Sequence, residues 1–279
     1  MQEIKSGKIG IIAGNGPLPK MIVNHLKNNG CEVFVVAHVG ETKEEDISNS
    51  NEVKWVNPGK LKDMIQALQE FGVYNVIFAG GLRKARLFKD IEPDKMAVEF
   101  ISSLPDLHDD TILRALAIKL EKEGFGVLDT TFGLGELLGS RGIKTYSKPT
   151  QKHLDDVKFG FYIAKSIGAL DIGQTVVVED HATLAIEAIE GTDEAILRAG
   201  NFSKGEGVVV KVKKPNQDVR FDLPSIGPST LKSMKRANLK VIAYEAYSTI
   251  VFEGDKFIRT ADELDLVVCG VTKEDMHNG

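Results

Sequence analysis

The stretch Lys8–Pro17, KIGIIAGNGP, determines the predicted fold of the first half of this 279-residue chain. It opens with a short apolar run, Lys8–Ala13, of the kind that forms a buried strand, and the glycines and proline behind that run end the strand. The apolar residues of the next segment, 18–29, recur at helical spacing, and Gly30 marks the end of a helix. The stretch therefore predicts a strand, a glycine turn and a helix in succession.

The same alternation continues toward the middle of the chain. Further strands are expected at Glu32–Ala37, Val73–Ala79 and Gly126–Leu128, and helices at Lys60–Phe71 and Asp109–Glu123. Strands and helices in alternation favour a parallel sheet with right-handed crossovers. The first half is therefore predicted to be a Rossmann-like α/β domain whose ligands bind at the carboxyl ends of the strands.

A stretch rich in Gly, Ser, Lys and Thr at 131–150 shows no sustained periodicity and is the predicted linker. It separates a predicted N-terminal domain, 1–130, from a second predicted α/β domain, 151–279. In the second domain we expect helices at Lys152–Ile167, Thr192–Ala199 and Ser229–Ala237, and strands at Thr175–Val178, Leu184–Ala188, Gly207–Val212, Val241–Ala243, Thr249–Phe252 and Leu266–Gly270.

Composition and charge restrict the classes of protein. Hydrophobic residues make up 42% and charged residues 27% of the chain, which is typical of a folded globular protein. The net charge of -5 disfavours a general nucleic-acid binder. Cys31 and Cys269 lie in apolar stretches and are predicted to be buried free thiols, as in a reducing, cytoplasmic compartment. There is no secretory signal and no apolar run long enough to span a bilayer, so a lipid substrate would be met from the aqueous side.

Glycines at two predicted strand ends are the first candidate ligand contacts. Gly14, Asn15 and Gly16 follow one strand, where glycines let a backbone approach a phosphate; a purely structural tight turn is the alternative. The third glycine of the dinucleotide fingerprint is replaced by Pro19, and no acid follows the second strand directly, so an NAD-dependent oxidoreductase is disfavoured.

Gly80 and Gly81 follow another strand and precede three basic residues, Arg83, Lys84 and Arg86. This arrangement suits an anionic ligand, although a solvated basic face would give the same pattern. At the start of the helix at 109–123, Asp110 is either part of an N-terminal cap or a carboxylate that handles metal or water.

The segment 211–227, which contains the loop predicted at 213–227, carries the densest mixture of charged and polar residues. Its candidates are Lys213, Lys214, Gln217, Asp218, Arg220 and Asp222. Phosphoryl transfer to water needs cations that offset pyrophosphate charge and a carboxylate that holds Mg²⁺ or orients water. A basic surface loop is the alternative.

Four polar residues around the predicted strand pair complete the candidates. Gln174, Glu179 and Glu187 are interpreted as buried polar partners of a ligand, and Thr192 as a helix N-cap near that ligand. His153 and His181 have no second ligand at metal spacing, so a zinc site is not expected.

Taken together, these segments resemble the UDP-2,3-diacylglucosamine pyrophosphatases of the LpxI type along nearly the whole chain. The landmarks are IGIIAGNGPLP (9–19), VIFAGGLRK (76–84), HDDTILRALAIKLEKEGF (108–125), LDIGQTVVVEDHATLAIEAIEGTDEAILRAG (170–200) and KKPNQDVRFDLPSIG (213–227). The last of these is far more specific than a short glycine motif.

The resemblance implies a Rossmann-like domain, a linker and a C-terminal catalytic α/β domain, with the substrate held between the domains. It also implies Mg²⁺-dependent hydrolysis, with Mn²⁺ as a substitute, of UDP-2,3-diacylglucosamine to UMP and 2,3-diacylglucosamine 1-phosphate. The resemblance further implies that water attacks the phosphorus on the sugar side. It identifies Asp222 as the essential carboxylate, either as metal ligand or as the base that orients water, and Asp218 is the second catalytic candidate.

Two further properties stay open at this point. Contact with the inner face of the membrane and a homodimer are both compatible with the resemblance. A non-catalytic carrier or sensor of the lipid product or of a nucleotide sugar would show the same sequence features, and metal-dependent UMP release distinguishes the enzyme from it.

Overall fold

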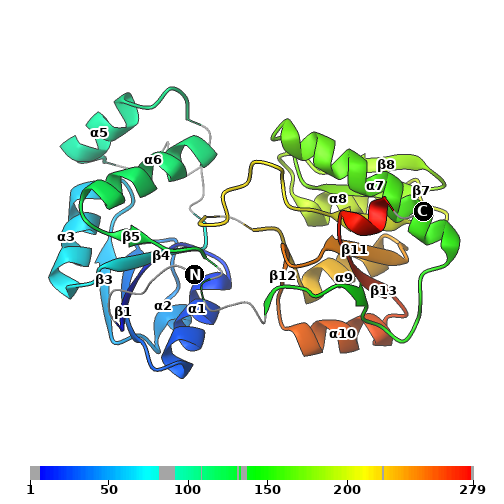
Figure 1. Ribbon diagram of the computed structural model, residues 1–279, viewed down its shortest axis with the longest axis horizontal. Helices are drawn as coiled ribbons and strands as arrows, with labels where there is room; N and C mark the ends of the chain where they lie inside the picture. The colour runs from blue at the N-terminus through cyan, green and yellow to red at the C-terminus, as the bar shows by residue number, and fades with distance from the viewer. Residues whose placement is uncertain are drawn as a thin grey trace. The chain divides into compact units, whose positions relative to one another are not determined.

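A computed structural model describes residues 7–81, 92–107, 109–130, 132, 137–221 and 223–277, without the side chains of residues 109 and 110. The chain divides into two compact units (Figure 1). Unit 1 comprises residues 1–134 together with 218–222, and unit 2 comprises 135–217 together with 223–279. A short piece of the later chain thus belongs to the earlier unit. The mixed α/β class expected from the sequence is confirmed.

Unit 1 is built on a five-stranded sheet in the order β3-β2-β1-β4-β5, with every neighbouring pair parallel. The strands are β1 (Lys8–Ala13), β2 (Glu32–His38), β3 (Glu52–Val56), β4 (Asn75–Ala79) and β5 (Gly126–Val127). The helices are α1 (Leu18–Asn28), α2 (Glu44–Ile47), α3 (Leu61–Phe71), α5 (Lys95–Ser102) and α6 (Asp109–Lys122). This is the strand order of a doubly wound sheet, and it brings the carboxyl ends of β1 and β4 side by side.

The core of unit 1 explains why these segments are strands and helices. The central strands β1, β2 and β4 are buried on both faces, as their continuous apolar sequences predict. The apolar stripe of α3, which includes Met64 and Leu68, packs on one face against Phe34 and Phe78. The edge strand β3 was not predicted, although the alternation of charged and apolar residues in its sequence, EVKWV, is itself a strand pattern.

Unit 2 contains a six-stranded sheet in the order β6-β13-β11-β9-β7-β8 and a separate two-stranded pair. Its strands are β6 (Gly142–Ile143), β7 (Thr175–Glu179), β8 (Ala182–Ile186), β9 (Val208–Lys211), β11 (Val241–Glu245) and β13 (Val267–Val271), with β10 (Ser225–Ile226) and β12 (Ile250–Val251) forming the pair. Its helices are α7 (Gln151–Ala169), α8 (Thr192–Ala199), α9 (Pro228–Arg236) and α10 (Gly254–Glu263), followed by the 3-10 turn η2 (Glu274–Met276). The stretch 131–150 therefore contributes a strand, β6, to unit 2.

Strand direction determines which side chains of unit 2 meet. Strands β9, β11 and β13 are parallel, whereas β7 and β8 are antiparallel to their neighbours. The start of β7 therefore lies beside the carboxyl ends of β8, β9 and β11, and we call this the polar edge of unit 2. One sheet face is covered by α7 and the other by α8, α9 and α10.

Both cysteines are free, as predicted, but only Cys269 is buried and Cys31 is half-buried. Burial raises the pKa of the Cys269 thiol to about 12, so this thiol stays protonated at neutral pH. Within the described ranges, no helix has both the length and the apolar character that a bilayer-spanning segment requires.

Candidate functional site

The two glycine turns of unit 1 come together at the carboxyl ends of β1 and β4. The Gly14 amide donates to the Ala79 carbonyl over 2.8 Å, and the Asn15 amide donates to the Gly81 carbonyl over 2.8 Å. The Gly81 amide returns a bond of 3.3 Å to the Asn15 carbonyl. A Cβ atom at Gly14 would collide with the Gly81 carbonyl, and one at Gly80 with the Asn15 carbonyl. Glycine is therefore required here by the close approach of two backbones.

This pairing bears on the two interpretations of the glycine motif. The N–H groups of Gly14, Asn15 and Gly81 donate to carbonyls within the turn, so they are not aimed at an anion. Gly16, which is exposed and has φ of +92°, lies just beyond the paired residues. A ligand at this strand edge would thus meet a rigid, backbone-paired rim. Hydrogen-bond donors to a phosphate would have to come from residues next to this rim.

A buried carboxylate that the sequence analysis did not single out supports this turn. Glu41 is only 5% exposed, and one of its carboxylate oxygens accepts a 2.8 Å hydrogen bond from the side-chain amide of Asn15. The Thr42 hydroxyl donates to the Ala13 carbonyl over 2.7 Å, and His38 Nδ1 lies 2.9 Å from the same oxygen. Burial lowers the pKa of His38, which favours the neutral ring. The loop after β2 therefore fixes the side chain of Asn15.

The segment 218–221 is packed into the core of unit 1. Phe221 is 8% exposed and meets the Phe78 ring edge-on, with ring centroids 5.2 Å apart. The Thr130 hydroxyl donates to the Arg220 carbonyl over 2.7 Å. Because Phe78 lies on β4, just before Gly80, the segment is anchored at the strand edge that carries the glycine turns. We call Phe221, Phe78 and Thr130 the Phe221 anchor.

Asp218 and Arg220, two predicted site residues, form an ion pair within this segment. An Arg220 guanidinium nitrogen lies 2.8 Å from an Asp218 oxygen, and a second guanidinium nitrogen and the Arg220 amide also donate to that carboxylate. These hydrogen bonds hold the pKa of Asp218 below its ordinary value. Arg220 also contacts Glu121 at 3.1 Å. The arrangement favours a structural role for Asp218, since a carboxylate with a lowered pKa and oxygens already occupied by Arg220 is a poor proton acceptor.

Several predicted residues lie outside what the structure describes. They are Asp222, the basic residues Arg83, Lys84 and Arg86, and the side chain of Asp110.

At the polar edge of unit 2, Lys213 and Lys214 begin the predicted loop. The Lys213 amide donates to Glu245 over 2.7 Å, and the Lys165 ammonium bonds both Glu245, at 2.6 Å, and the Lys213 carbonyl, at 2.8 Å. The Lys214 ammonium pairs with Asp171 at 2.6 Å. Lys165 and Glu245 thus fix the backbone from which the two predicted cations extend.

Gln217 closes the same loop, because its side-chain oxygen accepts a 3.0 Å hydrogen bond from the Lys214 amide. The Gln217 side-chain oxygen is therefore already hydrogen-bonded within the loop.

Of the four polar residues predicted around the strand pair of unit 2, Gln174 and Thr192 are joined through a third, Glu187. The Thr192 hydroxyl donates to one Glu187 carboxylate oxygen over 2.8 Å. The Gln174 backbone amide donates to the other carboxylate oxygen over 3.3 Å. The Lys211 ammonium donates to the Thr192 hydroxyl over 2.8 Å. Lys211 and Glu187 are 6% and 9% exposed, respectively. We call these four side chains the Thr192 cluster.

The expectation that Thr192 caps α8 is wrong. The N-cap residue is Gly191, which makes no side-chain hydrogen bond, and Thr192 is the first helical residue. Its hydroxyl turns instead toward Glu187 and Lys211, because a buried lysine and a buried carboxylate each need a polar partner.

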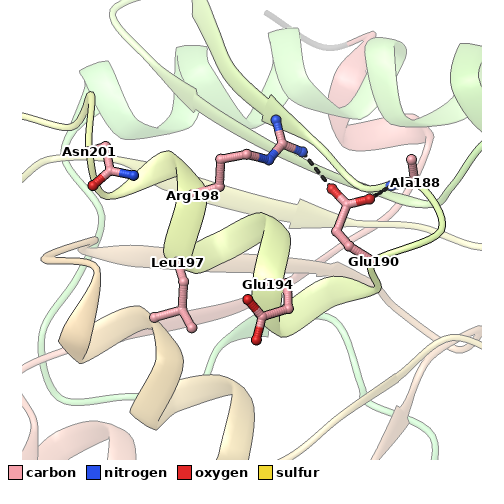
Figure 2. A pocket seen from close by; sticks show the side chains of 6 residues that line it. All are labelled: Ala188, Glu190, Glu194, Leu197, Arg198 and Asn201. Atoms are coloured by element: carbon pink, nitrogen blue, oxygen red, sulfur yellow. Dashed lines mark hydrogen bonds and ion pairs between the residues drawn. The ribbon is translucent and has the colours of Figure 1, made fainter.

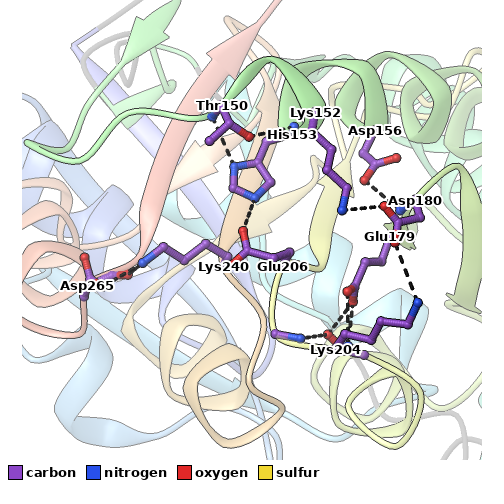
Figure 3. Close-up of polar contacts among 12 residues, drawn as sticks. Thr150, Lys152, His153, Asp156, Glu179, Asp180, Lys204, Glu206, Lys240 and Asp265 are labelled. Atoms are coloured by element: carbon purple, nitrogen blue, oxygen red, sulfur yellow. Dashed lines mark hydrogen bonds and ion pairs between the residues drawn. The ribbon is translucent and has the colours of Figure 1, made fainter.

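Glu179 and the two histidines lie at the opposite edge of the unit 2 sheet, and Figure 3 shows Glu179 and His153 in local contacts. Glu179 accepts from the Ser203 hydroxyl and the Lys204 amide, at 2.6 and 2.9 Å. His153 contacts Glu206 at 2.7 Å, and the His181 amide donates to buried Asp156 over 2.7 Å. These groups stabilise turns and are separate from the polar edge.

A shallow depression beside α8 is lined by Ala188, Glu190, Glu194, Leu197, Arg198 and Asn201 (Figure 2). Its only lining cation, Arg198, is paired with Glu190 at 2.6 Å. None of the predicted site residues lines it, so we do not place the active site there.

An Mg²⁺ site requires oxygen ligands, which in proteins are mainly carboxylates. The described part of the chain contains no group of three or more His, Cys, Asp or Glu side chains arranged to hold a metal ion. Mg²⁺ commonly uses only one or two carboxylates, with water and substrate phosphate completing its shell. A single carboxylate beside a pyrophosphate therefore fits this ion, and Asp218 is less suited because Arg220 occupies it.

Sequence reasoning missed Lys165, Lys211 and Glu245, although a signal was present. Lys211 ends the run VVVK, and Glu245 ends VIAYE, both in buried strands. Charged residues are rarely buried unless paired, so a charge that ends such a strand indicates a partner at the sheet edge.

Family models match both parts of the chain. The LpxI N-terminal domain matches residues 8–137, and the LpxI C-terminal domain matches residues 140–269. A curated relative, the UDP-2,3-diacylglucosamine pyrophosphatase LpxI of Caulobacter vibrioides, is 32% identical over 96% of this chain and 99% of its own length.

Solved structures show only distant likeness. A biotin carboxylase domain of a thermophilic 2-oxoglutarate carboxylase bound to ADP aligns with a TM-score of 0.28 and 12% identity, over 61% of this chain and 34% of its own. The N5-carboxyaminoimidazole ribonucleotide synthetase of Thermotoga maritima aligns with a TM-score of 0.26 and 14% identity, over 78% of this chain and 46% of its own. Likeness at this level supports no functional conclusion.

Proposed function

This chain belongs to the LpxI family, and we propose that it hydrolyses the pyrophosphate of UDP-2,3-diacylglucosamine to UMP and 2,3-diacylglucosamine 1-phosphate, a step of lipid A biosynthesis. The observation that carries the proposal is the end-to-end match with the Caulobacter pyrophosphatase, which spans both family domains. The chain is accordingly an enzyme. If the chain were instead a carrier or sensor of the same ligand, it would bind the substrate without releasing UMP.

The described residues support the proposal in two places. In unit 1 the Phe221 anchor holds the segment 218–221 at the strand edge where Gly14 and Gly80 meet. In unit 2 the Lys165–Glu245 pair fixes the backbone of Lys213. Carboxyl ends of strands are where α/β enzymes place reacting groups.

Within this proposal each described residue has a task. Lys213 and Lys214 offset the charge of the pyrophosphate, which makes attack by water less unfavourable. Asp218 and Arg220 hold each other and so keep their segment rigid. Preorganised charges of this kind are more effective than mobile ones, since they need not reorient during reaction.

Mg²⁺ is part of the proposal, with Mn²⁺ as a substitute, and Asp222 is its proposed protein ligand. When bound, the ion would neutralise phosphate charge as the bond to the leaving group breaks. That the substrate contacts both domains, and that the protein meets the membrane or forms a homodimer, stay predictions.

The position of attack can be tested with the isotope of water. We expect hydrolysis in H₂¹⁸O to place the label in 2,3-diacylglucosamine 1-phosphate, because the proposal has water attack the phosphorus on the sugar side. Mass spectrometry of both products gives the answer. Label found in UMP instead would keep the hydrolase and overturn this regiochemistry, and failure to form either product would overturn the function.

A further inference from the structure

The Thr192 cluster fixes the direction of every hydrogen bond that Thr192 makes. A hydroxyl has one proton to donate and two lone pairs that accept. The Thr192 proton goes to the Glu187 carboxylate at 2.8 Å, and one lone pair accepts from the Lys211 ammonium at 2.8 Å. These directions cannot reverse, since an ammonium only donates and an ionised carboxylate only accepts. Toward a ligand, the Thr192 hydroxyl can therefore only accept.

Gln174 adds a second acceptor to the same cluster. Its side-chain oxygen is buried, and it has no hydrogen-bond partner in the part of the chain that the structure describes. Its backbone amide donates to Glu187, which ties it to Thr192 through one carboxylate. A Cβ atom at Gly173 would collide with the Glu187 carbonyl, so glycine permits this approach of the two loops. A buried acceptor without a partner is costly unless a ligand or water supplies a donor.

Three exposed apolar residues lie in the two loops around the cluster. Leu170 and Ile172 precede Gln174 and are exposed, and Ile189, which follows Glu187, is fully exposed. The two loops touch at Gly173 and Glu187, so these exposed apolar residues lie within a few chain positions of the polar cluster. A ligand that suits both features carries neutral hydrogen-bond donors together with hydrocarbon.

We propose that the Thr192 hydroxyl and the Gln174 side-chain oxygen form a subsite that accepts hydrogen bonds from hydroxyl or amide N–H groups of an acylated sugar. Phosphate oxygens at neutral pH are acceptors, so they find no donor in the Thr192 hydroxyl or the Gln174 oxygen. Uridine also carries N–H and hydroxyl donors, but it lacks the hydrocarbon that would suit the exposed Leu170 and Ile172. The proposal rests on the proposed function, because it takes the acylated sugar from that substrate.

The test measures the binding of three ligands to the full-length protein by calorimetry. The ligands are 2,3-diacylglucosamine 1-phosphate in mixed micelles, UMP and inorganic pyrophosphate. Thr192→Val removes the acceptor at nearly constant volume, and Thr192→Ser keeps it as the matched control. Because Thr192→Val also removes a partner from Lys211 and Glu187, Gln174→Met serves as a second variant that leaves those contacts in place.

We expect Thr192→Val and Gln174→Met to weaken binding of the acylated sugar phosphate about fivefold, the effect of one lost hydrogen bond. Binding of UMP and pyrophosphate should stay unchanged, and Thr192→Ser should behave as wild type. Equal weakening of pyrophosphate or UMP binding would overturn the proposal, and so would unchanged binding of the sugar phosphate by folded variants. Failure of the wild-type protein to bind the sugar phosphate would overturn it as well.

The proposed function and this subsite can fail separately. Wild-type protein that binds the sugar phosphate with the expected pattern but hydrolyses no substrate would refute the function and keep the subsite. Wild-type protein that hydrolyses the substrate, beside variants with unchanged sugar binding, would refute the subsite alone.

Discussion

Replacement of Phe221 by alanine should both destabilise unit 1 and impair the reaction. Phe221 is 8% exposed, and its ring packs edge-on against Phe78 at a centroid distance of 5.2 Å. Truncating a buried phenylalanine to alanine typically costs about 3–5 kcal/mol. Since Phe221 lies in a loop segment that can partly close over the space, we take the lower end, about 3 kcal/mol.

The only tryptophan of the chain, Trp55, makes this measurable because it lies on β3 of unit 1. Its fluorescence during urea denaturation reports the unfolding of unit 1. With a urea dependence of about 2 kcal/mol per molar, a loss of about 3 kcal/mol lowers the midpoint by about 1.5 M. The matched control is Phe202→Ala, because Phe202 is 65% exposed and lies in unit 2. It should leave the Trp55 transition unchanged.

Activity should fall further than stability alone explains. Phe221 anchors the segment that precedes Asp222, and loss of positioning by about 1 Å can cost roughly a hundredfold in rate. We therefore expect kcat to drop at temperatures where Phe221→Ala is still folded, and Phe221→Leu to recover part of both effects. A Phe221→Ala protein whose midpoint and kcat both match those of Phe202→Ala would refute the packing and the positioning argument together.

Two further changes test the neighbouring contacts. Gly80→Ala should disrupt the turn, because Gly80 has φ of +80° and a Cβ there meets the Asn15 carbonyl. The backbone conformation alone should destabilise unit 1 by about 1 kcal/mol or more. Gly7→Ala, where the new Cβ meets nothing, is the control in the same urea titration. Asp218→Asn should cost about 1 kcal/mol at pH 7, measured by urea denaturation across pH. The folded pKa of Asp218 is depressed, so its contribution is complete above the unfolded pKa of about 3.9 and is lost as pH falls through the lower folded pKa. A wild-type advantage over Asp218→Asn that persists unchanged under acid conditions would contradict the ion-pair account.

The sequence predicted most of the central elements because their signals are local. Continuous apolar runs such as those of β1 and β4 are typical of strands buried on both faces, and the stripe on α3 has clear helical spacing. The edge strands β3 and β6 were missed, since β3 has five residues of which two are charged and β6 has only two residues. Edge strands bury less, so less of their sequence is constrained.

The connections between distant residues could not be predicted. Phe221 packs against Phe78, and no local pattern shows that a segment of the later chain belongs to unit 1. The pairing of Asp218 with Arg220 also depends on loop conformation, so the sequence left Asp218 as a catalytic candidate. In contrast, Gly14 and Gly80 were found as strand-end glycines, although their tight mutual pairing was visible only in the structure.

The most direct test of the central claim is UMP release from UDP-2,3-diacylglucosamine by the purified full-length protein. The assay compares Mg²⁺ with excess chelator, and wild type with Asp222→Ala. We expect release that requires Mg²⁺ and that falls by at least about a hundredfold in the variant, as for loss of a preorganised catalytic group. Substrate binding without any UMP release under both conditions would contradict the account and identify a binding protein.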